Sequence, residues 1–385
     1  MEHRSRDLRQ PVRFLPGDER YEPDTGVALC LSGGGYRAMM FHAGVLRRLN
    51  EMGWLPRLDR VSAVSGGSIT AAALALAWEA LEFDAAGYSP RFVELVEDPL
   101  GHLASQTIDI RAVTTGILSP FATVGERVAA AYREHLFGQA KLGDLPASPR
   151  FVFNATNVGS GSLVRFNSAP YVADWRLGRV LHADVEVAVA VACSSAFPPV
   201  LSPFRLSFDA EWTTEPGNDL DTAEYRDELV LTDGGVYDNL GLETAWKQFR
   251  TVLVSDAGGH LSPDPDPQGD WARHMVRVLK VVDNQVRSLR KRQVITALQD
   301  GLREGSYFGI RSDISHFELP DALDAPLPLT SQLADLPTRL AKTDRVTQRR
   351  LVNWGYAIAD AAVRRWVDAT PPAPTGYPYP EEGVG

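Results

Sequence analysis

Three consecutive glycines, Gly33 to Gly35, constrain the fold of this chain more than any other feature of its sequence. They follow the apolar run VALCLS (27–32), which is typical of a strand buried on both faces of a parallel sheet. The residues after them, 36–51, place apolar side chains at helical spacing. Because glycine loses more backbone freedom on folding than any other residue, this strand-to-helix turn indicates that the bare backbone has a function.

A second strand and helix follow, RVSAVS (60–65) and residues 66–81. Parallel strands joined by right-handed crossovers end at the same edge of a sheet, which is where open α/β sheets bind ligands. We therefore expect an α/β fold in which the turn at Gly33–Gly35 lies beside the turn that follows Val64. Further along, RFVFNATN and SLVRFNS around VGSG predict a hairpin, and ELVLTDGG (228–235) and TVLVSDAGG (251–259) predict strands that run into glycine turns.

The second turn predicts a catalytic serine. Its residues, Ala63-Val64-Ser65-Gly66-Gly67, match the G-x-S-x-G nucleophile elbow with alanine in place of the first glycine, and alanine is still small enough for a tight turn. The Ser65 hydroxyl would project at the amino end of a helix, whose free N–H groups favour an oxyanion. The amides of Gly33, Gly34 and Gly35 would complete an oxyanion hole. Ser62 and Ser68, in contrast, are predicted to be a strand residue and a helix-start residue.

A serine nucleophile needs a base, and two aspartates are candidates. Asp233 and Asp256 each follow an apolar strand and precede a glycine turn, where partial burial would raise the pKa of a carboxyl group and make it a better base. Sequence spacing does not separate them. His260 follows Asp256 closely, but a surface loop position is its ordinary interpretation.

The glycine turn also allows a different function. Gly33, Gly35 and Ala38 satisfy G-x-G-x-x-A, the dinucleotide fingerprint, so the alternative is a nucleotide-binding oxidoreductase. That fingerprint expects an acidic residue at the end of the next strand, whereas this strand ends in Ser65. Arg37, in the first helical turn, opposes the helix dipole and should have an anionic partner, either a neighbouring carboxylate or a phosphate head group.

Composition narrows the class of protein and its partners. The 385 residues are 44% apolar with a formal charge of −10, which supports a large core and argues against a broad nucleic-acid-binding face. Cys30 and Cys193 stand in apolar surroundings, as buried thiols do in a reducing compartment. The polar N-terminus resembles no signal peptide or membrane span, so we expect a soluble, cytoplasmic protein.

Polar and proline-rich segments of the sequence predict where the domain begins and ends. Residues 1–25 form a polar lead-in, residues 26–370 a single domain, and residues 371–385 a disordered, proline-rich tail. Residues 209–228 form an acidic surface insertion. The segment VEVAVAVA (185–192) is ambiguous, because its period of two favours a strand although a fully buried helix has no contrasting period.

Four motifs together resemble the patatin-like phospholipase family: GGGYR, SAVSGGS, ACSSAFPPV and DGGVYDN, in this order within residues 27–260. The resemblance implies a three-layer α/β/α fold with a mostly parallel central sheet. It also implies a lipid acyl hydrolase with a Ser-Asp dyad and an acyl-enzyme intermediate, without metal or cofactor. It assigns the nucleophile to Ser65, the base to Asp233 rather than Asp256, and the oxyanion element to Gly33–Gly35 followed by Arg37, and it favours a helix for 185–193.

Peripheral helices are expected over residues 270–370, outside the motif-bearing core (27–260). Within them, residues 273–298 carry many basic side chains among apolar ones at helical spacing. A packed helix with a solvated face is one interpretation. The other is a surface that makes peripheral contact with anionic lipid. A third function class is therefore a catalytically inactive lipid-binding module, which would bind vesicles without reacting with a serine-directed probe.

Overall fold

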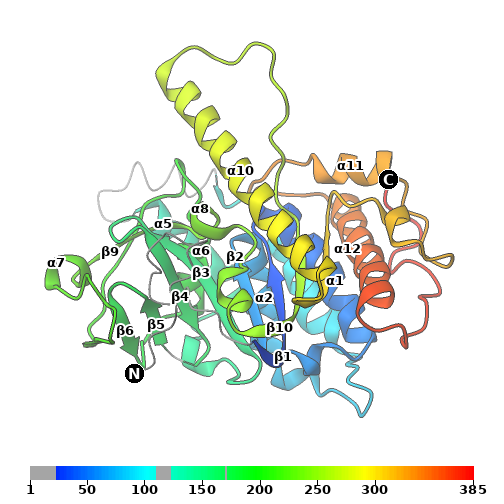
Figure 1. The fold of residues 1–385 in the computed structure, drawn as a ribbon, viewed down its shortest axis with the longest axis horizontal. Helices are drawn as coiled ribbons and strands as arrows, with labels where there is room; N and C mark the ends of the chain where they lie inside the picture. The colour runs from blue at the N-terminus through cyan, green and yellow to red at the C-terminus, as the bar shows by residue number, and fades with distance from the viewer. Residues whose placement is uncertain (1–22, 110–122, 170) are drawn as a thin grey trace, which may run out of the picture.

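The computed structural model describes residues 23–109, 123–169 and 171–385, and a single mixed sheet runs through them (Figure 1). Its strand order is β11-β10-β1-β2-β3-β4-β5-β6-β8, and β9 pairs with β3 and β7. The strands are β1 (Asp24–Leu31), β2 (Arg60–Val64), β3 (Arg150–Asn157), β4 (Ser162–Asn167), β5 (Tyr171–Asp174), β6 (Gly178–Leu181), β7 (Phe204–Leu206), β8 (Trp212–Thr213), β9 (Leu229–Asp233), β10 (Phe249–Asp256) and β11 (Glu304–Gly309).

Strands β11, β10, β1, β2 and β3 are parallel, and the strands beyond β3 are antiparallel. The parallel part contains the strands expected on either side of the glycine turns, and the β3–β4 hairpin is present as predicted. Strand β1 lies at the middle of the parallel part, with β2 on one side and β10 on the other. The chain therefore changes direction across the sheet at β1, and in open α/β sheets this is where ligands bind.

Helices cover both faces of the parallel strands. The helices are α1 (Gly35–Glu51), α2 (Gly66–Ala77), α3 (Asp98–Ala104), α5 (Val124–Tyr132), α6 (Val187–Ser194), α7 (Ala223–Arg226), α8 (Gly235–Asp238), α9 (Glu243–Trp246), α10 (Trp271–Gln299), α11 (Leu327–Ala334) and α12 (Arg345–Trp366). Short 3-10 or π-helical segments lie at Leu55–Arg57, Glu79–Leu81, Val93–Glu97, Arg133–Phe137, Leu142–Asp144 and Ile314–Phe317. Within the described ranges, none of these helices combines the length and the apolar composition that a membrane span needs.

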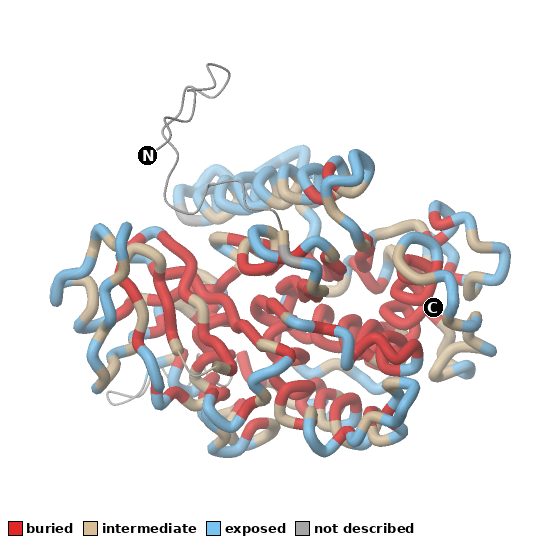
Figure 2. Tube along the Cα trace, turned by 60° about the horizontal axis from the view of Figure 1, so that its bottom comes forward, coloured by how far each residue is buried: buried red, intermediate tan, exposed pale blue. Residues whose placement is uncertain are grey.

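Alternate residues of β1 show the three layers. Leu29 and Leu31 join the large core with α1, α2 and α12, whereas Ala28 and Cys30 join a smaller core with α9 and the C-terminal part of α10. All four side chains are fully buried, and Figure 2 shows the buried residues concentrated between the layers. The predicted α/β/α fold is therefore confirmed.

Helices α1 and α12 approach each other closely because both carry a glycine at the crossing. A Cβ atom on Gly44 would lie 1.9 Å from the Val352 carbonyl oxygen, and one on Gly355 would lie 1.9 Å from that of Phe41. The largest fully buried side chain, Trp354, lies beside this crossing and donates to the Ile310 carbonyl at 2.8 Å. Helix α1, which begins at the glycine turn, is thus fixed by its close packing against α12.

Several expectations about single segments have clear outcomes. Residues 187–194 form helix α6, as the resemblance implied and the period of two did not. Helix α2 ends at Ala77, four residues before the predicted end. The predicted lead-in (1–25) lies mostly outside the described residues, and β1 already begins at Asp24.

The last segment, 371–385, differs from the disordered tail expected from its prolines. Val384 is buried, and the Asn353 side-chain amide donates to the carbonyls of Tyr379 and Gly383, each at 2.7 Å. Arg349 also forms an ion pair with Glu382 at 2.6 Å. The segment lacks helix and strand, but its apolar and aromatic side chains are packed against α12.

Candidate active site

Ser65 and Asp233 are brought together by β3. Strand β2 pairs with the first part of β3, so that Val64 lies opposite Asn154. Strand β9 pairs with the next residues of β3, so that Asp233 lies opposite Ala155. Because β4 occupies the other edge of β3 at these residues, β2 and β9 lie end to end along one edge. The residue that follows β2 and the last residue of β9 therefore meet.

The direction of β9 is opposite to that of β2. Strand β2 is parallel to β3 whereas β9 is antiparallel to it, so Asp233 approaches Ser65 from the opposite direction.

The backbone at Ser65 is strained in the way that a nucleophile elbow requires. Its φ is 52° and its ψ is −119°, values that a residue other than glycine rarely adopts. The glycines that follow allow the turn to fit: a Cβ atom on Gly66 would lie 2.2 Å from the Gly35 carbonyl oxygen, and one on Gly67 would lie 2.4 Å from that of Leu31. Ala63 is fully buried in β2, so alanine is accommodated at the first position of the motif.

Ser194, at the end of α6, supports the elbow and was not singled out from the sequence. Its hydroxyl accepts the backbone N–H of Ser65 at 3.0 Å and donates to the Asn154 carbonyl at 2.6 Å. It also lies 2.9 Å from the Ser68 hydroxyl, and the Ser194 carbonyl accepts the N–H of Gly234. The fully buried Ser194 therefore joins both halves of the site, and its only signal in the sequence is the motif ACSSAFPPV.

The Asp233 carboxyl group has an unusually high pKa. Burial raises the pKa to about 7, although the Gly235 N–H and the neighbouring Ser65 hydroxyl both act to lower it. The Gly235 amide donates to Oδ1 at 2.7 Å, while Oδ2 makes no well-formed hydrogen bond within the described residues. One carboxylate oxygen is thus fixed, and the other has no partner of its own in the described residues.

The three glycines of the first turn are not equivalent. The N–H of Gly33 donates to the Asn239 carbonyl at 3.1 Å, so it is already used. In the part of the chain that the structure describes, no hydrogen bond uses the N–H of Gly34 or of Gly35. Both have positive φ, 149° and 60°, which explains why glycine stands there. Of the predicted oxyanion donors, Gly34 and Gly35 are thus the two whose amides are available.

Within the described residues, no carboxylate forms an ion pair with Arg37. It is buried, and its guanidinium donates to two backbone carbonyls, Leu336 and Ala257, the second at 3.0 Å. Burial, helped by the charges of Arg311 and Arg287, lowers its pKa to about 10. These two hydrogen bonds join the glycine turn to the end of β10 and to the segment after α11.

Asp256, the competing aspartate, lies in a different environment. Although burial would raise its pKa, the Arg287 guanidinium, the Tyr307 hydroxyl and the Gly258 amide hold it at about 2. The carboxylate lies 3.2 Å from Arg287 and accepts the Tyr307 hydroxyl at 2.6 Å. A group so firmly ionised and paired is a weak base. His260 is exposed, as expected for a loop residue.

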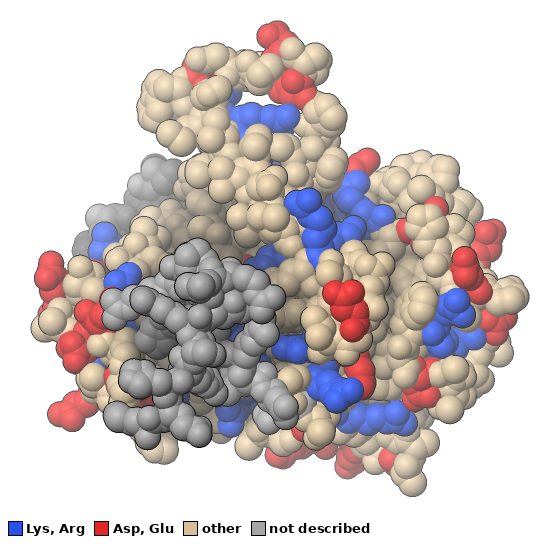
Figure 3. Space-filling view, viewed as in Figure 1, with Lys and Arg blue, Asp and Glu red and all other residues tan. Residues whose placement is uncertain are grey.

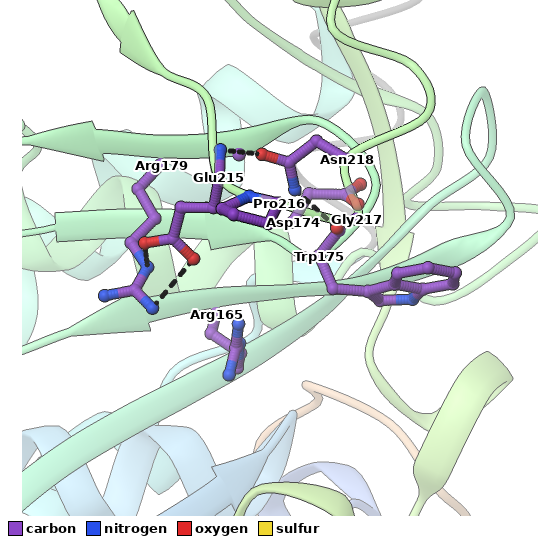
Figure 4. Close-up of a pocket in the computed structure, with 9 residues that line it drawn as sticks. Arg165, Asp174, Trp175, Arg179, Glu215, Pro216, Gly217 and Asn218 are labelled. Carbon is purple, nitrogen blue, oxygen red and sulfur yellow. Dashed lines mark hydrogen bonds and ion pairs between the residues drawn. The ribbon is translucent and has the colours of Figure 1, made fainter. Parts of the chain in front are cut away.

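Ser65 does not line either of two small polar cavities among the described residues. One, of about 140 Å³, lies among the antiparallel strands and is lined by Arg165, Trp175, Arg179 and Glu215, among others (Figure 4). The other, of about 130 Å³, lies beside Asp256 and is lined by residues that include Arg287 and Lys291. No group of three or more His, Cys, Asp or Glu side chains within the described residues is arranged to hold a metal ion.

Comparisons with curated proteins and with solved structures indicate what this chain is similar to. No functionally curated protein matches the chain. Among solved structures, human GIVD cytosolic phospholipase A2 is similar at 14% identity over 63% of this chain and 50% of that one, with a TM-score of 0.39. VipD from Legionella pneumophila is similar at 15% identity over 87% of this chain and 66% of that one, with a TM-score of 0.34. The chain thus spans about half the length of the human structure.

The sequence-level comparison is more direct. The family model of the patatin-like phospholipases matches residues 29–246, which include the glycine turn, the elbow, the end of α6 and the turn after β9. Because this match covers more than half of the chain, the chain belongs to the patatin-like phospholipase family.

Proposed function

We propose that this chain hydrolyses fatty-acyl ester bonds of lipids, with Ser65 as the nucleophile and Asp233 as the general base. The observation that carries the proposal is the meeting of a serine on a strained elbow with a buried carboxyl group whose pKa is about 7. A base of that pKa accepts a proton readily near neutral pH, whereas an ordinary solvated aspartate does not. Membership of the family supports the same class of reaction.

The geometry suggests a sequence of proton and acyl transfers. Oδ2 of Asp233, which has no other partner in the described structure, takes the Ser65 proton as Oγ attacks the ester carbonyl. The tetrahedral oxyanion is held by the amides of Gly34 and Gly35. Its collapse expels the alcohol, which receives the proton from Asp233, and leaves an acyl-enzyme. Asp233 then deprotonates a water molecule, which attacks the acyl-enzyme. As the second tetrahedral intermediate collapses and the fatty acid leaves, Asp233 returns the proton to Ser65 Oγ.

The oxidoreductase alternative receives no support from the arrangement around the glycine turn. The Arg339 carbonyl accepts the Tyr36 N–H at 3.0 Å, and a Cβ atom on Gly35 would lie 2.5 Å from that same carbonyl oxygen. The Tyr36 N–H, one of the helix-start donors that a bound pyrophosphate would use, is therefore already occupied. Strand β2 ends without the acidic residue that would hold a ribose.

Two variants and a covalent probe test the proposal. We expect Ser65→Ala and Asp233→Asn each to reduce hydrolysis of a soluble short-chain ester by at least about a thousandfold, because catalytic groups that act as a unit fail together. The wild type should be labelled by a fluorophosphonate probe, and Ser65→Ala should not.

Asp256→Asn is the matched control, since it alters an aspartate in a similar turn that is paired with Arg287. It should still be labelled. Wild-type rates in either dyad variant that remains folded would contradict the assignment, and a wild type that resists the probe would favour an inactive lipid-binding module.

A further inference from the structure

Helix α10 is anchored at one end only. Its C-terminal half is held by the Arg287–Asp256 pair at 3.2 Å, by the Arg290–Glu243 pair at 3.0 Å, and by the fully buried Val294. Its N-terminal half stands clear of the rest of the molecule (Figure 1) and is largely exposed (Figure 2). A long helix extending into solvent in this way normally carries a polar surface.

The exposed side of α10 instead carries an apolar face, which begins in the N-terminal half and continues to Leu289 in the anchored half. Trp271 is 84% exposed, Leu279 57% and Val282 54%, and further members of the face are also in contact with solvent. The face, called here the α10 stripe, consists of Trp271, Met275, Val278, Leu279, Val282, Val286 and Leu289. At 100° per residue these positions span an arc of about 100°, a width that is usual for a helix face packed against an extended apolar phase.

The opposite side of the helix is basic. Arg273, Arg277 and Lys280 lie there, and Asp283 is the only acidic residue between Trp271 and Arg292. Figure 3 shows Lys and Arg beside the base of α10 and at one place near its free end, where acidic side chains also lie, although the chain as a whole has a formal charge of −10. A local excess of positive charge on an acidic protein is complementary to an anionic surface.

We propose that the N-terminal half of α10 binds anionic lipid bilayers by inserting the α10 stripe below the head groups while its basic side chains contact them. The inference rests on the proposed function, because the bilayer would contain the ester substrate. An apolar face with an aromatic residue at its end and lysine and arginine on the other side is typical of helices that lie in a membrane interface.

The width of the stripe favours a bilayer over a second copy of the chain. A two-helix coiled coil needs a narrow seam of apolar residues, and along that seam Gln285 and Arg292 would occupy positions that require apolar side chains. The α10 stripe includes Leu279 and Val286, which lie to one side of the seam. A bilayer covers all seven residues at once.

The anchored half of α10 contacts the edge of the sheet at which the glycine turn lies. Arg287 pairs with Asp256 at the end of β10, the strand next to β1. A Cβ atom on Gly258 would lie 2.3 Å from Arg287 Nη2 and 2.9 Å from Asn239 Nδ2, and the Asn239 carbonyl holds the Gly33 amide. A bilayer bound to the stripe would thus meet the molecule on the side where the glycine turn lies.

Two basic residues near the C-terminal end of α10 contact the rest of the molecule. Arg290 pairs with Glu243, and the Lys291 ammonium lies over the Tyr307 ring, 5.1 Å from its centroid. These side chains hold the helix to the molecule, so changing them would test the anchor rather than the membrane contact.

The insertion can be measured at one position of the stripe. Cys30 and Cys193 are fully buried, and burial raises the pKa of both thiols, so a Met275→Cys variant provides a single reactive site for an environment-sensitive nitrobenzoxadiazole label. We expect its fluorescence to rise and shift to the blue with vesicles of phosphatidylcholine and phosphatidylglycerol in equal parts, and to change little with phosphatidylcholine alone. Unchanged fluorescence with both vesicles would overturn the proposal.

A charge within the stripe should abolish binding. We expect Leu279→Asp/Val282→Asp to weaken cosedimentation with the mixed vesicles by about a hundredfold or more, because two aspartates would have to enter the apolar layer. Val158→Asp is the matched control: Val158 is 59% exposed, in the β3–β4 turn, and should leave binding unchanged. Equal binding by all three proteins, or a dimer that the double variant dissociates without any vesicle binding by the wild type, would contradict the proposal.

Activity separates this proposal from the proposed function. The double variant should hydrolyse a soluble short-chain ester at the wild-type rate but vesicle phospholipid far more slowly. If the wild type binds vesicles and hydrolyses neither substrate, the proposed function fails while the membrane contact stands. If it hydrolyses both and the double variant does so equally well, the membrane contact fails alone.

Discussion

At the scale of single residues, the site depends on one strained serine and one unusual carboxyl group. The positive φ of Ser65 persists because the surrounding structure fixes it: Ser194 holds its amide, and glycines leave room on its C-terminal side. In the proposed function, this turn presents the Ser65 hydroxyl to Asp233, so the strain would serve catalysis.

The pKa of Asp233 predicts how activity depends on pH. The base must be ionised, so kcat/KM for a soluble ester should rise about tenfold per pH unit below about pH 7 and level off above it. A stopped assay across pH 5 to pH 9 on a neutral substrate would check this. An acid limb near pH 4 would mean that Asp233 behaves as an ordinary aspartate and is not the base.

Asp233 also makes the free energy of unfolding depend on pH, in the opposite direction to activity. Because its pKa in the folded state is raised from 3.8 to about 7, folding favours the protonated form. Its contribution to stability is therefore present at low pH and is lost as the pH rises through about 7. Asp233→Asn should remove this dependence, so the difference in unfolding free energy between variant and wild type should grow from pH 5 to pH 8.

Ser194 predicts a loss of catalysis through positioning. Ser194→Ala removes the acceptor of the Ser65 amide, so we expect kcat to fall by at least about tenfold with little change in KM. Ser168→Ala is the control, since Ser168 is equally buried and accepts the Phe151 amide at the other end of β3. Each should destabilise by about 1–3 kcal/mol, but only Ser194→Ala should slow the reaction, and equal kcat losses would assign Ser194 a merely structural role.

At the scale of elements, the glycines at the start of α2 determine how closely that helix approaches β1. Gly67→Ala would place a Cβ atom 2.4 Å from the Leu31 carbonyl oxygen and 2.7 Å from that of Ser32, both backbone atoms that have little room to move. We expect a loss of about 3 kcal/mol in unfolding free energy, measured by urea denaturation. Gly101→Ala, also within a helix, meets only a side-chain atom at 3.3 Å and should be neutral or slightly stabilising; similar losses in both would remove the packing argument.

Many of the helices and strands could be predicted from the sequence. In β1, α1, β2 and α2 the apolar residues have a clear pattern, and glycines mark the turns between these elements. Helix α6 could not be predicted from periodicity, since a buried helix of small apolar residues has no polar side to reveal its period of 3.6. Ser194 was missed for a related reason: a buried serine at a helix end carries no local signal of the two segments that it joins. For residues 273–298 the sequence left two interpretations open, because apolar positions at helical spacing fit both a packed helix and a helix that contacts lipid.

At the scale of the whole molecule, the site exists because distant segments meet on β3. No local sequence pattern predicts that β9 pairs antiparallel with the end of β3. The sequence therefore predicted both residues of the proposed dyad but not the strand pairing that brings them together. The choice between Asp233 and Asp256 likewise came from the family resemblance. The structure adds a physical reason for it, namely that Arg287 neutralises the environment of Asp256 and nothing comparable faces Asp233 in the described residues.

The C-terminal segment predicts a global effect of truncation. Ending the chain at Thr370 would expose the site of Val384, leave the Asn353 amide without the carbonyls of Tyr379 and Gly383, and remove the Pro372 carbonyl that accepts from the buried Arg48. Because each of these groups lies along the α1–α12 pair that supports the glycine turn, the truncated chain should melt several degrees lower, with a loss of about 3 kcal/mol or more. Thermal unfolding of the full chain and the truncated chain measures this. Asn353→Ala in the full chain should lose part of the same energy, whereas equal melting temperatures for all three proteins would restore the expectation of a disordered tail.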